Sequence, residues 1–66
     1  MIIRINGKPE SLVPGMSIET LLSARSLNPA CVVVEVNRDI VKKERFDSVV
    51  LKDGDSVEIL RFVGGG

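Results

Sequence analysis

The chain has 66 residues, which suits one small domain that buries only about 60% of its unfolded surface and has no room for a deep catalytic cleft. Nine basic and nine acidic residues cancel, which argues against a general binder of nucleic acid or membrane surfaces, because such binders carry a basic excess. Histidine is absent and Cys31 is the single cysteine, which excludes a disulfide framework and a thiolate–imidazole pair, so an autonomous enzyme is not expected.

The first 13 residues predict a β-hairpin. Alternation in Met1-Ile2-Ile3-Arg4-Ile5 places Met1, Ile3 and Ile5 on one face of a strand. The following Asn6-Gly7 dipeptide tolerates the two positive-φ positions of a type I′ turn. Residues 9–13 would form the return strand. Because Pro9 has no N–H, that end of the strand is expected at a sheet edge.

One helix is predicted after Pro14-Gly15. Ser17 has the side chain of a helix N-cap, and Glu19 follows near the positive end of the helix dipole. Apolar residues at three- and four-residue spacing indicate one stripe facing a sheet: Ile18, Leu21, Leu22 and Leu27. Asn28-Pro29 is expected to end the helix, because proline disfavours the helical conformation in the residue before it.

The second half of the chain predicts three more strands. Residues 30–36 are rich in β-branched valine, and alternation puts one set on the face beneath the helix: Ala30, Val32, Val34 and Val36. A turn at 37–39, apolar anchors at Ile40-Val41 and one irregular helical turn at 42–46 follow. Residues 49–51 predict a short strand, and the tight turn of Asp53-Gly54-Asp55 precedes the last strand.

This order is strand, strand, helix, strand, short strand, strand. One helix on one face of a mixed sheet gives a single small core, as the layer rule requires. The order resembles the β-grasp, or ubiquitin-like, fold, an α+β fold that would have four to five strands in this chain. That resemblance implies that the first and last strands pair in parallel at the sheet centre. We expect residues 1–63 to form the single domain and residues 64–66 a flexible glycine tail.

The last strand carries the candidate docking residues. If Val57 and Ile59 face the helix, Leu60 and Phe62 face the other way. The two large apolar side chains are then either buried or form an exposed patch, and the sequence leaves both open. The functional hypothesis is a docking patch for a partner enzyme, made of four consecutive residues: Leu60, Arg61, Phe62 and Val63.

Three glycines, Gly64, Gly65 and Gly66, follow this strand. At about 3.3–3.6 Å per extended residue, they would carry a terminal carboxylate roughly 10 Å beyond the folded body. A frayed tail is the commoner interpretation of a chain end, but the lack of Ser, Lys or Glu here favours a functional Gly66 carboxylate. Coupling to AMP by a partner that uses ATP would activate this carboxylate, and a sulfur nucleophile would then displace AMP and leave a thiocarboxylate.

Other chemistry-bearing residues have structural interpretations. Cys31 is predicted to be a small half-buried strand residue rather than a sulfur-carrying thiol. The basic run from Lys42 to Arg45 is predicted to be a solvated surface, with Glu44 in its midst. Asp53 and Asp55 fall far short of the 6–8 oxygens that calcium takes, so no metal site is expected.

Five motifs along the chain are together similar to those of a known family: Ile5-Asn6-Gly7-Lys8, Leu21-Leu22, Val34-Glu35-Val36-Asn37 with Ile40-Val41, the run from Leu51 to Ile59, and Phe62-Val63-Gly64-Gly65-Gly66. The chain resembles the ThiS family, the sulfur carriers of thiamine biosynthesis. Two positions depart from the family pattern: Arg38 stands where the family often has glycine, and Lys42-Lys43 replaces a frequent Pro-Arg. These departures concern the details of partner recognition more than the activity.

The resemblance implies an E1-like, ThiF-like enzyme that adenylates Gly66 with ATP, a sulfur donor protein, and a ThiG-like thiazole synthase that receives the sulfur. The chain itself would bind no cofactor. A membrane span needs about 20 apolar residues, and no apolar run in the chain approaches this length. Residues 1–20 also lack the charged and then apolar order of a signal peptide, so a soluble cytoplasmic protein is expected.

Two alternatives remain open from the sequence. One is a related sulfur carrier of the MoaD-like kind, which would serve molybdopterin synthesis or another sulfur pathway with the same tail chemistry. The other is a ubiquitin-like conjugation tag or interaction module. Covalent attachment to target lysines would favour the tag, and a normal phenotype after trimming Gly65-Gly66 would favour the plain module.

Overall fold

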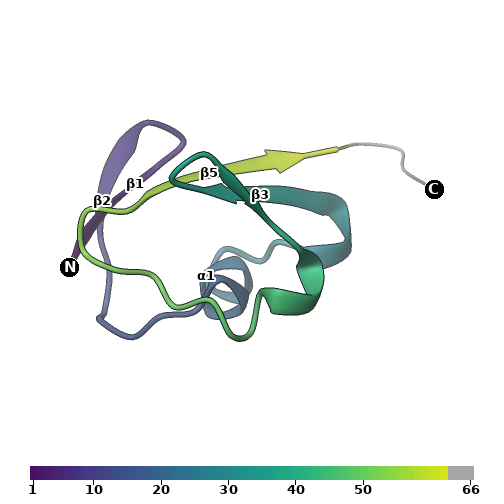
Figure 1. The fold of residues 1–66 in the computed structure, drawn as a ribbon, viewed down its shortest axis with the longest axis horizontal. Helices are drawn as coiled ribbons and strands as arrows, with labels where there is room; N and C mark the ends of the chain where they lie inside the picture. Colours follow the sequence, from purple (N-terminus) through teal and green to yellow (C-terminus); the bar gives the residue numbers. More distant parts are fainter. Residues whose placement is uncertain (63–66) are drawn as a thin grey trace.

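The computed structural model describes residues 1–62, which form a five-stranded sheet with one α-helix packed against one face (Figure 1). The strands are β1 (Ile2–Ile5), β2 (Lys8–Ser11), β3 (Val32–Val36), β4 (Asp39–Val41) and β5 (Ser56–Arg61). Helix α1 spans Ile18–Ala24, and short 3₁₀ turns cover Pro29–Cys31 and Lys43–Arg45. The mixed sheet and the single helix agree with the predicted architecture.

Strand β5 lies at the centre of the sheet, whose order is β2-β1-β5-β3-β4. It runs parallel to β1, with Ile5 opposite Val57, and antiparallel to β3, with Val34 opposite Ile59. The predicted parallel pairing of the first and last strands is therefore confirmed. The strand that leads toward the chain end has a neighbour on each side.

The opening hairpin forms as predicted. Asn6 and Gly7 have φ values of 51° and 83°, the two left-handed positions that a type I′ turn requires. Strand β2 lies at the sheet edge, where the missing N–H of Pro9 costs no ladder hydrogen bond. The return strand ends at Ser11 rather than at Val13.

Helix α1 begins as predicted but ends earlier. The Ser17 Oγ accepts a hydrogen bond from the Thr20 N–H at 3.1 Å, which caps the helix. The prediction that Asn28-Pro29 ends the helix is wrong, because α1 stops at Ala24. Ser26 adopts a left-handed φ of 57°, and the Leu27 N–H donates to the Leu22 carbonyl at 2.9 Å, which is a Schellman C-cap.

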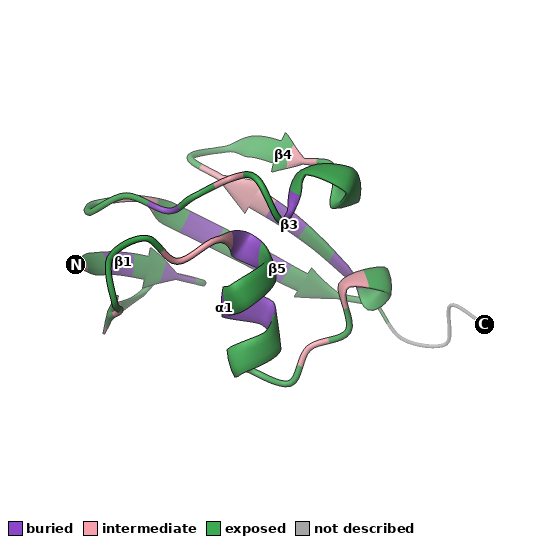
Figure 2. Cartoon of the chain, turned by 90° about the horizontal axis from the view of Figure 1, so that it is seen from below, coloured by how far each residue is buried: buried purple, intermediate pink, exposed green. Residues whose placement is uncertain are grey.

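The core lies between α1 and the sheet (Figure 2). Helix α1, strands β1, β3 and β5, and the segment between β4 and β5 contribute buried apolar side chains: Ile3, Ile5, Ile18, Leu21, Leu22, Val32, Val34, Phe46, Leu51, Val57 and Ile59. The predicted helix stripe and the alternation of β1, β3 and β5 are thus confirmed, and Leu27 and Val36 pack against this core as partly buried residues. The opposite face of the sheet has no helix over it among residues 1–62.

Two predictions in the second half of the chain need correction. Residues 30–31 belong to a 3₁₀ turn, because Asn28 caps that turn by accepting a bond from the Ala30 N–H at 2.9 Å. Residues 49–51 form an isolated bridge with the segment before α1 instead of a strand, and the short strand is β4. Ile40, predicted to be an apolar anchor, is exposed, whereas Phe46 and Leu51 are buried. The predicted helical turn before Phe46 is confirmed.

Arg38 occupies an unfavourable backbone conformation in the turn between β3 and β4. Its φ is 73°, and a left-handed conformation costs a non-glycine residue roughly 1–2 kcal/mol. We expect Arg38→Gly to raise the free energy of unfolding by about 0.5–1 kcal/mol, after the entropy cost of glycine is subtracted. Urea denaturation measures this change. The matched control is Arg38→Ala, which keeps the strain, and equal stability of the two variants would contradict the prediction.

Candidate functional site

The C-terminal half of β5 presents the predicted docking residues. Val57 and Ile59 are buried against the core, whereas Leu60 is 62% exposed and Phe62 is 48% exposed. Alternation along the strand therefore puts Leu60 on the uncovered face of the sheet, and Phe62, one residue beyond the strand, is exposed as well. The structure decides between the two readings left open by the sequence in favour of an exposed apolar pair.

The other predicted site residues lie elsewhere. Arg61 is exposed and pairs with Val32 across the sheet, so alternation places it on the face opposite Leu60. Val63, Gly64, Gly65 and Gly66 lie outside the described residues, and so does the predicted division between domain and tail. The roles assigned to these four residues, and a docking role for Arg61, stay predictions.

Strand β3 supports the end of β5 on one side. Val33 is the direct cross-strand partner of Leu60 and is itself 37% exposed on the same face. One residue beyond the strand, the Phe62 N–H donates to the Cys31 carbonyl at 3.1 Å. The segment that carries the exposed pair Leu60 and Phe62 is therefore held by backbone hydrogen bonds up to the last described residue.

A side chain supports β5 on its other side. The backbone pairing of β1 with β5 ends where the Asn6 N–H donates to the Val57 carbonyl at 2.9 Å. The Asn6 amide then makes two bonds to one residue: its Oδ1 accepts from the Ile59 N–H at 2.7 Å, and its Nδ2 donates to the Ile59 carbonyl at 3.2 Å. The side chain thus replaces a strand backbone directly before Leu60. Sequence reasoning assigned Asn6 only to the turn, and no local signal reveals this second role.

We expect Asn6→Gly to preserve the turn and remove the side-chain support of β5. Glycine adopts the left-handed φ of this position freely, so the expected loss of about 1–2 kcal/mol in unfolding free energy comes mainly from the two hydrogen bonds to Ile59. Hydrogen exchange at the Ile59 amide should accelerate. Asn6→Asp keeps the acceptor for that amide, so its exchange should be slower than in Asn6→Gly. Equal exchange in all three proteins would show that Asn6 acts only in the turn.

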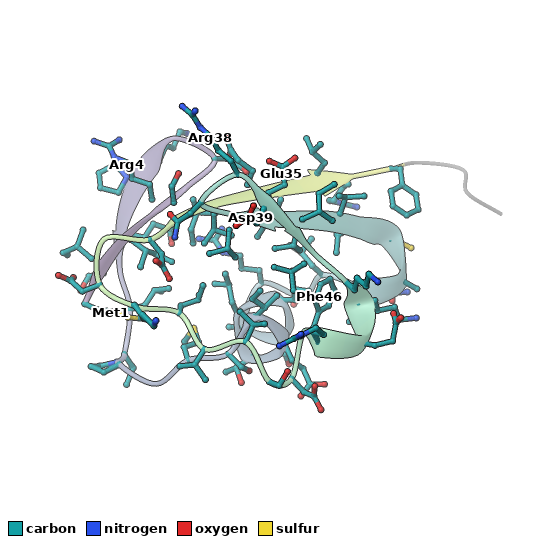
Figure 3. The ribbon with its side chains drawn as sticks, in the orientation of Figure 1. Met1, Arg4, Glu35, Arg38, Asp39 and Phe46 are labelled. Carbon is teal, nitrogen blue, oxygen red and sulfur yellow. The ribbon has the colours of Figure 1, made fainter. Side chains whose placement is uncertain are left out.

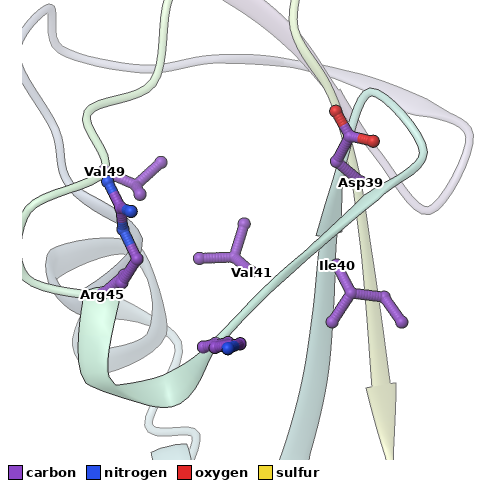
Figure 4. A pocket seen from close by; sticks show the side chains of 6 residues that line it. Asp39, Ile40, Val41, Arg45 and Val49 are labelled. Atoms are coloured by element: carbon purple, nitrogen blue, oxygen red, sulfur yellow. The ribbon is translucent and has the colours of Figure 1, made fainter.

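A shallow depression lies along the edge strand β4 (Figure 4). Its volume is about 540 Å³, and its lining combines one carboxylate, two cations and three aliphatic side chains: Asp39, Ile40, Val41, Lys42, Arg45 and Val49. No residue of β5 takes part, so this depression is separate from the exposed apolar pair. The mixed charges give no arrangement of a nucleophile and a base that would indicate catalysis.

The remaining candidates have structural roles in the part of the chain that is described. Cys31 is exposed at the end of a 3₁₀ turn, so the prediction of a half-buried strand residue is wrong. The Asp53 carboxylate accepts from the Ile2 N–H, and that of Asp55 accepts from the Lys52 N–H, as expected of turn residues. Within residues 1–62 no group of three metal-ligating side chains gathers. Over the same range no helix has the length and apolarity to cross a membrane.

A parallel β1–β5 pair, one helix and a central strand leading to the chain end define a ubiquitin-like β-grasp domain. The fold matches the crystal structure of the thiamine biosynthesis protein ThiS from Geobacter metallireducens with a TM-score of 0.86 and 39% identity, over 100% of both chains. The model of the ThiS family matches residues 3–66. This chain belongs to the ThiS family of sulfur carrier proteins, so the sequence-based resemblance is confirmed.

Curated relatives agree with this assignment. The sulfur carrier protein ThiS of Bacillus subtilis is 39% identical over 66 residues, which cover 98% of this chain and 100% of the relative. Thiazole synthases of Magnetococcus marinus and Paramagnetospirillum magneticum are 36% and 38% identical over 66 residues. The chain spans only 20% of the length of each of these two synthases. Because a segment similar to this chain occurs within thiazole synthases, the family is linked to thiazole formation.

Proposed function

We propose that this chain carries sulfur, as a thiocarboxylate on Gly66, for thiazole formation in thiamine biosynthesis. The observation that carries the proposal is the match to the whole of Bacillus subtilis ThiS, since this chain corresponds to a complete sulfur carrier protein there. The exposed apolar pair Leu60 and Phe62 adds support, because only Val63 separates it from the glycines that would enter a partner's active site.

The proposed chemistry takes place on the Gly66 carboxyl group. A carboxylate oxygen attacks the α-phosphorus of ATP and releases pyrophosphate, which leaves a glycyl adenylate. Hydrosulfide then attacks the acyl carbon, the bond to AMP breaks, and the products are the thiocarboxylate, AMP and a proton. A glycine at this position leaves the acyl carbon unhindered, and the thiocarboxylate sulfur is the nucleophile that is delivered to the thiazole precursor.

The proposed partners are those that membership of the ThiS family implies. An E1-like, ThiF-like enzyme would bind ATP and catalyse the adenylation, so this chain acts as a co-substrate and binds no cofactor of its own. A sulfur donor protein would supply the sulfur, and a ThiG-like thiazole synthase would receive it. We place these reactions in the cytoplasm. Gly64 and Gly65 would lie in the narrow channel of each partner, where backbone without side chains fits best.

Intact-mass measurement tests this proposal. The chain is incubated with an E1-like adenylating enzyme of the ThiF kind, ATP and sulfide, and we expect the mass gain of one sulfur in place of one oxygen. A parallel reaction without ATP controls for sulfide adducts and should show no gain. An unchanged mass with an enzyme that activates another ThiS protein under the same conditions would contradict the proposal.

A further inference from the structure

Two carboxylates lie directly opposite each other on the uncovered face of the sheet. Glu35 of β3 and Glu58 of β5 are cross-strand partners, a position in which like charges repel and weaken a sheet. Among residues 1–62 the single ion pair joins Arg25 to Glu10, so no cation pairs with either carboxylate there. Because this pair opposes folding, stabilisation of the sheet does not account for it.

Exposed apolar side chains flank this acidic pair on two sides. Val33 and Leu60 form the next cross-strand pair on the same face, toward the end of β5. On the other side, Ile40 of β4 is the cross-strand partner of Glu35 and is 68% exposed. A carboxylate pair flanked by exposed apolar groups matches a partner surface with one cation among apolar side chains.

Basic residues occupy the opposite end of this face. Arg4 and Arg38 lie on the same side of the sheet as Glu35, near the start of β5, and α1 lies on the other side (Figure 3). The Arg4 guanidinium donates to the Gly7 carbonyl at 3.1 Å. The face is therefore basic at the start of β5, acidic in the middle and apolar toward the chain end.

This order of charges disfavours a second copy of the chain as the occupant. In a two-fold pairing over this face, whether the two β5 strands run parallel or antiparallel, the central carboxylates of one copy would face those of the other. Four carboxylates would then lie together without a cation, which is costly once water is excluded. The occupant is expected to be a different protein with a basic residue at the centre of its interface.

We propose that thiazole synthase docks on this face and inserts an Arg or Lys between Glu35 and Glu58. The proposal rests on the function proposed above, and it adds the residues that would select the partner. Thiazole synthase is the occupant we infer because two synthases contain a segment similar to all of this chain. A partner cation would turn the repulsion between the carboxylates into two charge-assisted hydrogen bonds.

The test measures binding of the unmodified chain to the thiazole synthase of the same organism by calorimetry at low and high salt. We expect the double variant Glu35→Gln/Glu58→Gln to bind roughly tenfold more weakly or worse and to lose most of the salt dependence. Its thermal stability should equal or exceed that of the wild type, because a repulsion has been removed. The control variant Glu19→Gln/Glu44→Gln removes two exposed charges outside the sheet and should bind normally.

Two outcomes would overturn the proposal. Equal affinity of the double variant and the wild type would show that the synthase does not recognise the acidic pair. If the wild-type chain does not bind the synthase, the synthase is excluded as the occupant. The same holds if sedimentation shows that the chain associates with itself instead. Thiocarboxylate formation is measured separately by intact mass. Failure of the carrier function and failure of this docking surface are therefore distinguishable.

Discussion

Deletion of Gly66 is expected to abolish thiocarboxylate formation and leave the fold intact. The shortened chain still ends in a glycine carboxylate, so the reacting group is unchanged and only its position differs. Because the extended tail is one residue shorter, its acyl carbon would reach about 3.3–3.6 Å less far from the folded domain. Because a misplacement of about 1 Å can cost roughly a hundredfold in rate, we expect a loss of at least that size.

The stability of this variant should match that of the wild type, because the buried residues that the structure describes run from Ile3 to Ile59. Intact mass after incubation with the adenylating enzyme, ATP and sulfide measures the first effect, and thermal unfolding followed by circular dichroism measures the second. Thiolation of the shortened chain at the wild-type rate would contradict the proposed reach of the tail. Loss of cooperative unfolding would contradict the division between the fold and the tail.

Leu60→Asp is expected to weaken partner binding strongly at little cost in stability. Leu60 is 62% exposed on the uncovered face, so a carboxylate there remains hydrated in the free protein and is desolvated only when a partner docks. It would also place a third negative charge close to Glu35 and Glu58. We expect at least about a tenfold loss of affinity for thiazole synthase, against a loss of only about 1 kcal/mol in unfolding free energy.

Ile59→Asp is the matched control, since it moves the same substitution one residue back along β5. Ile59 is only 7% exposed and faces α1, so its variant should lose several kcal/mol and be largely unfolded. Urea denaturation and calorimetric titration separate the two effects. Similar loss of stability in both variants would place Leu60 in the core, and normal binding by Leu60→Asp would remove it from the docking surface.

Local signals explain why much of this fold could be predicted from the sequence. Ser17 needs only its own side chain and the next turn of backbone to cap α1. The Asn6-Gly7 turn depends only on which residues tolerate positive φ. The alternation around Val57 and Ile59 follows from the pleat of a strand. Each of these features is decided within a few residues, so a single sequence contains the information.

Features without a clear local signal in the sequence were missed. Helix α1 ends at a Schellman motif in which a serine, Ser26, takes the left-handed position usually held by glycine, so the sequence shows no stop signal there. Residues 49–51 have the β propensity of a strand, but their backbone bonds go to Met16 and Ile18 beside the helix. Tertiary pairing overrides propensity at residues 49–51, whereas the helix ends at a local cap that lacks its usual residue.

The candidate site shows the same division. Alternation put Leu60 and Phe62 together on one face, but their exposure depends on the lack of a second covering layer among residues 1–62. The opposition of Glu35 and Glu58 depends on the register between β3 and β5, which local patterns do not specify. The support of β5 by Asn6 joins residues 53 positions apart. Cross-strand register is therefore the information that the sequence alone lacked.

The most direct test of the central claim is a single turnover of sulfur transfer. The chain is thiolated with isotopically labelled sulfide, freed of excess sulfide, and mixed with thiazole synthase and its thiazole precursors. We expect the labelled sulfur to leave Gly66 and appear in the thiazole, and the chain to return to its unmodified mass. Label that stays on the chain, or a thiazole formed without it, would contradict the role of this protein as the sulfur carrier.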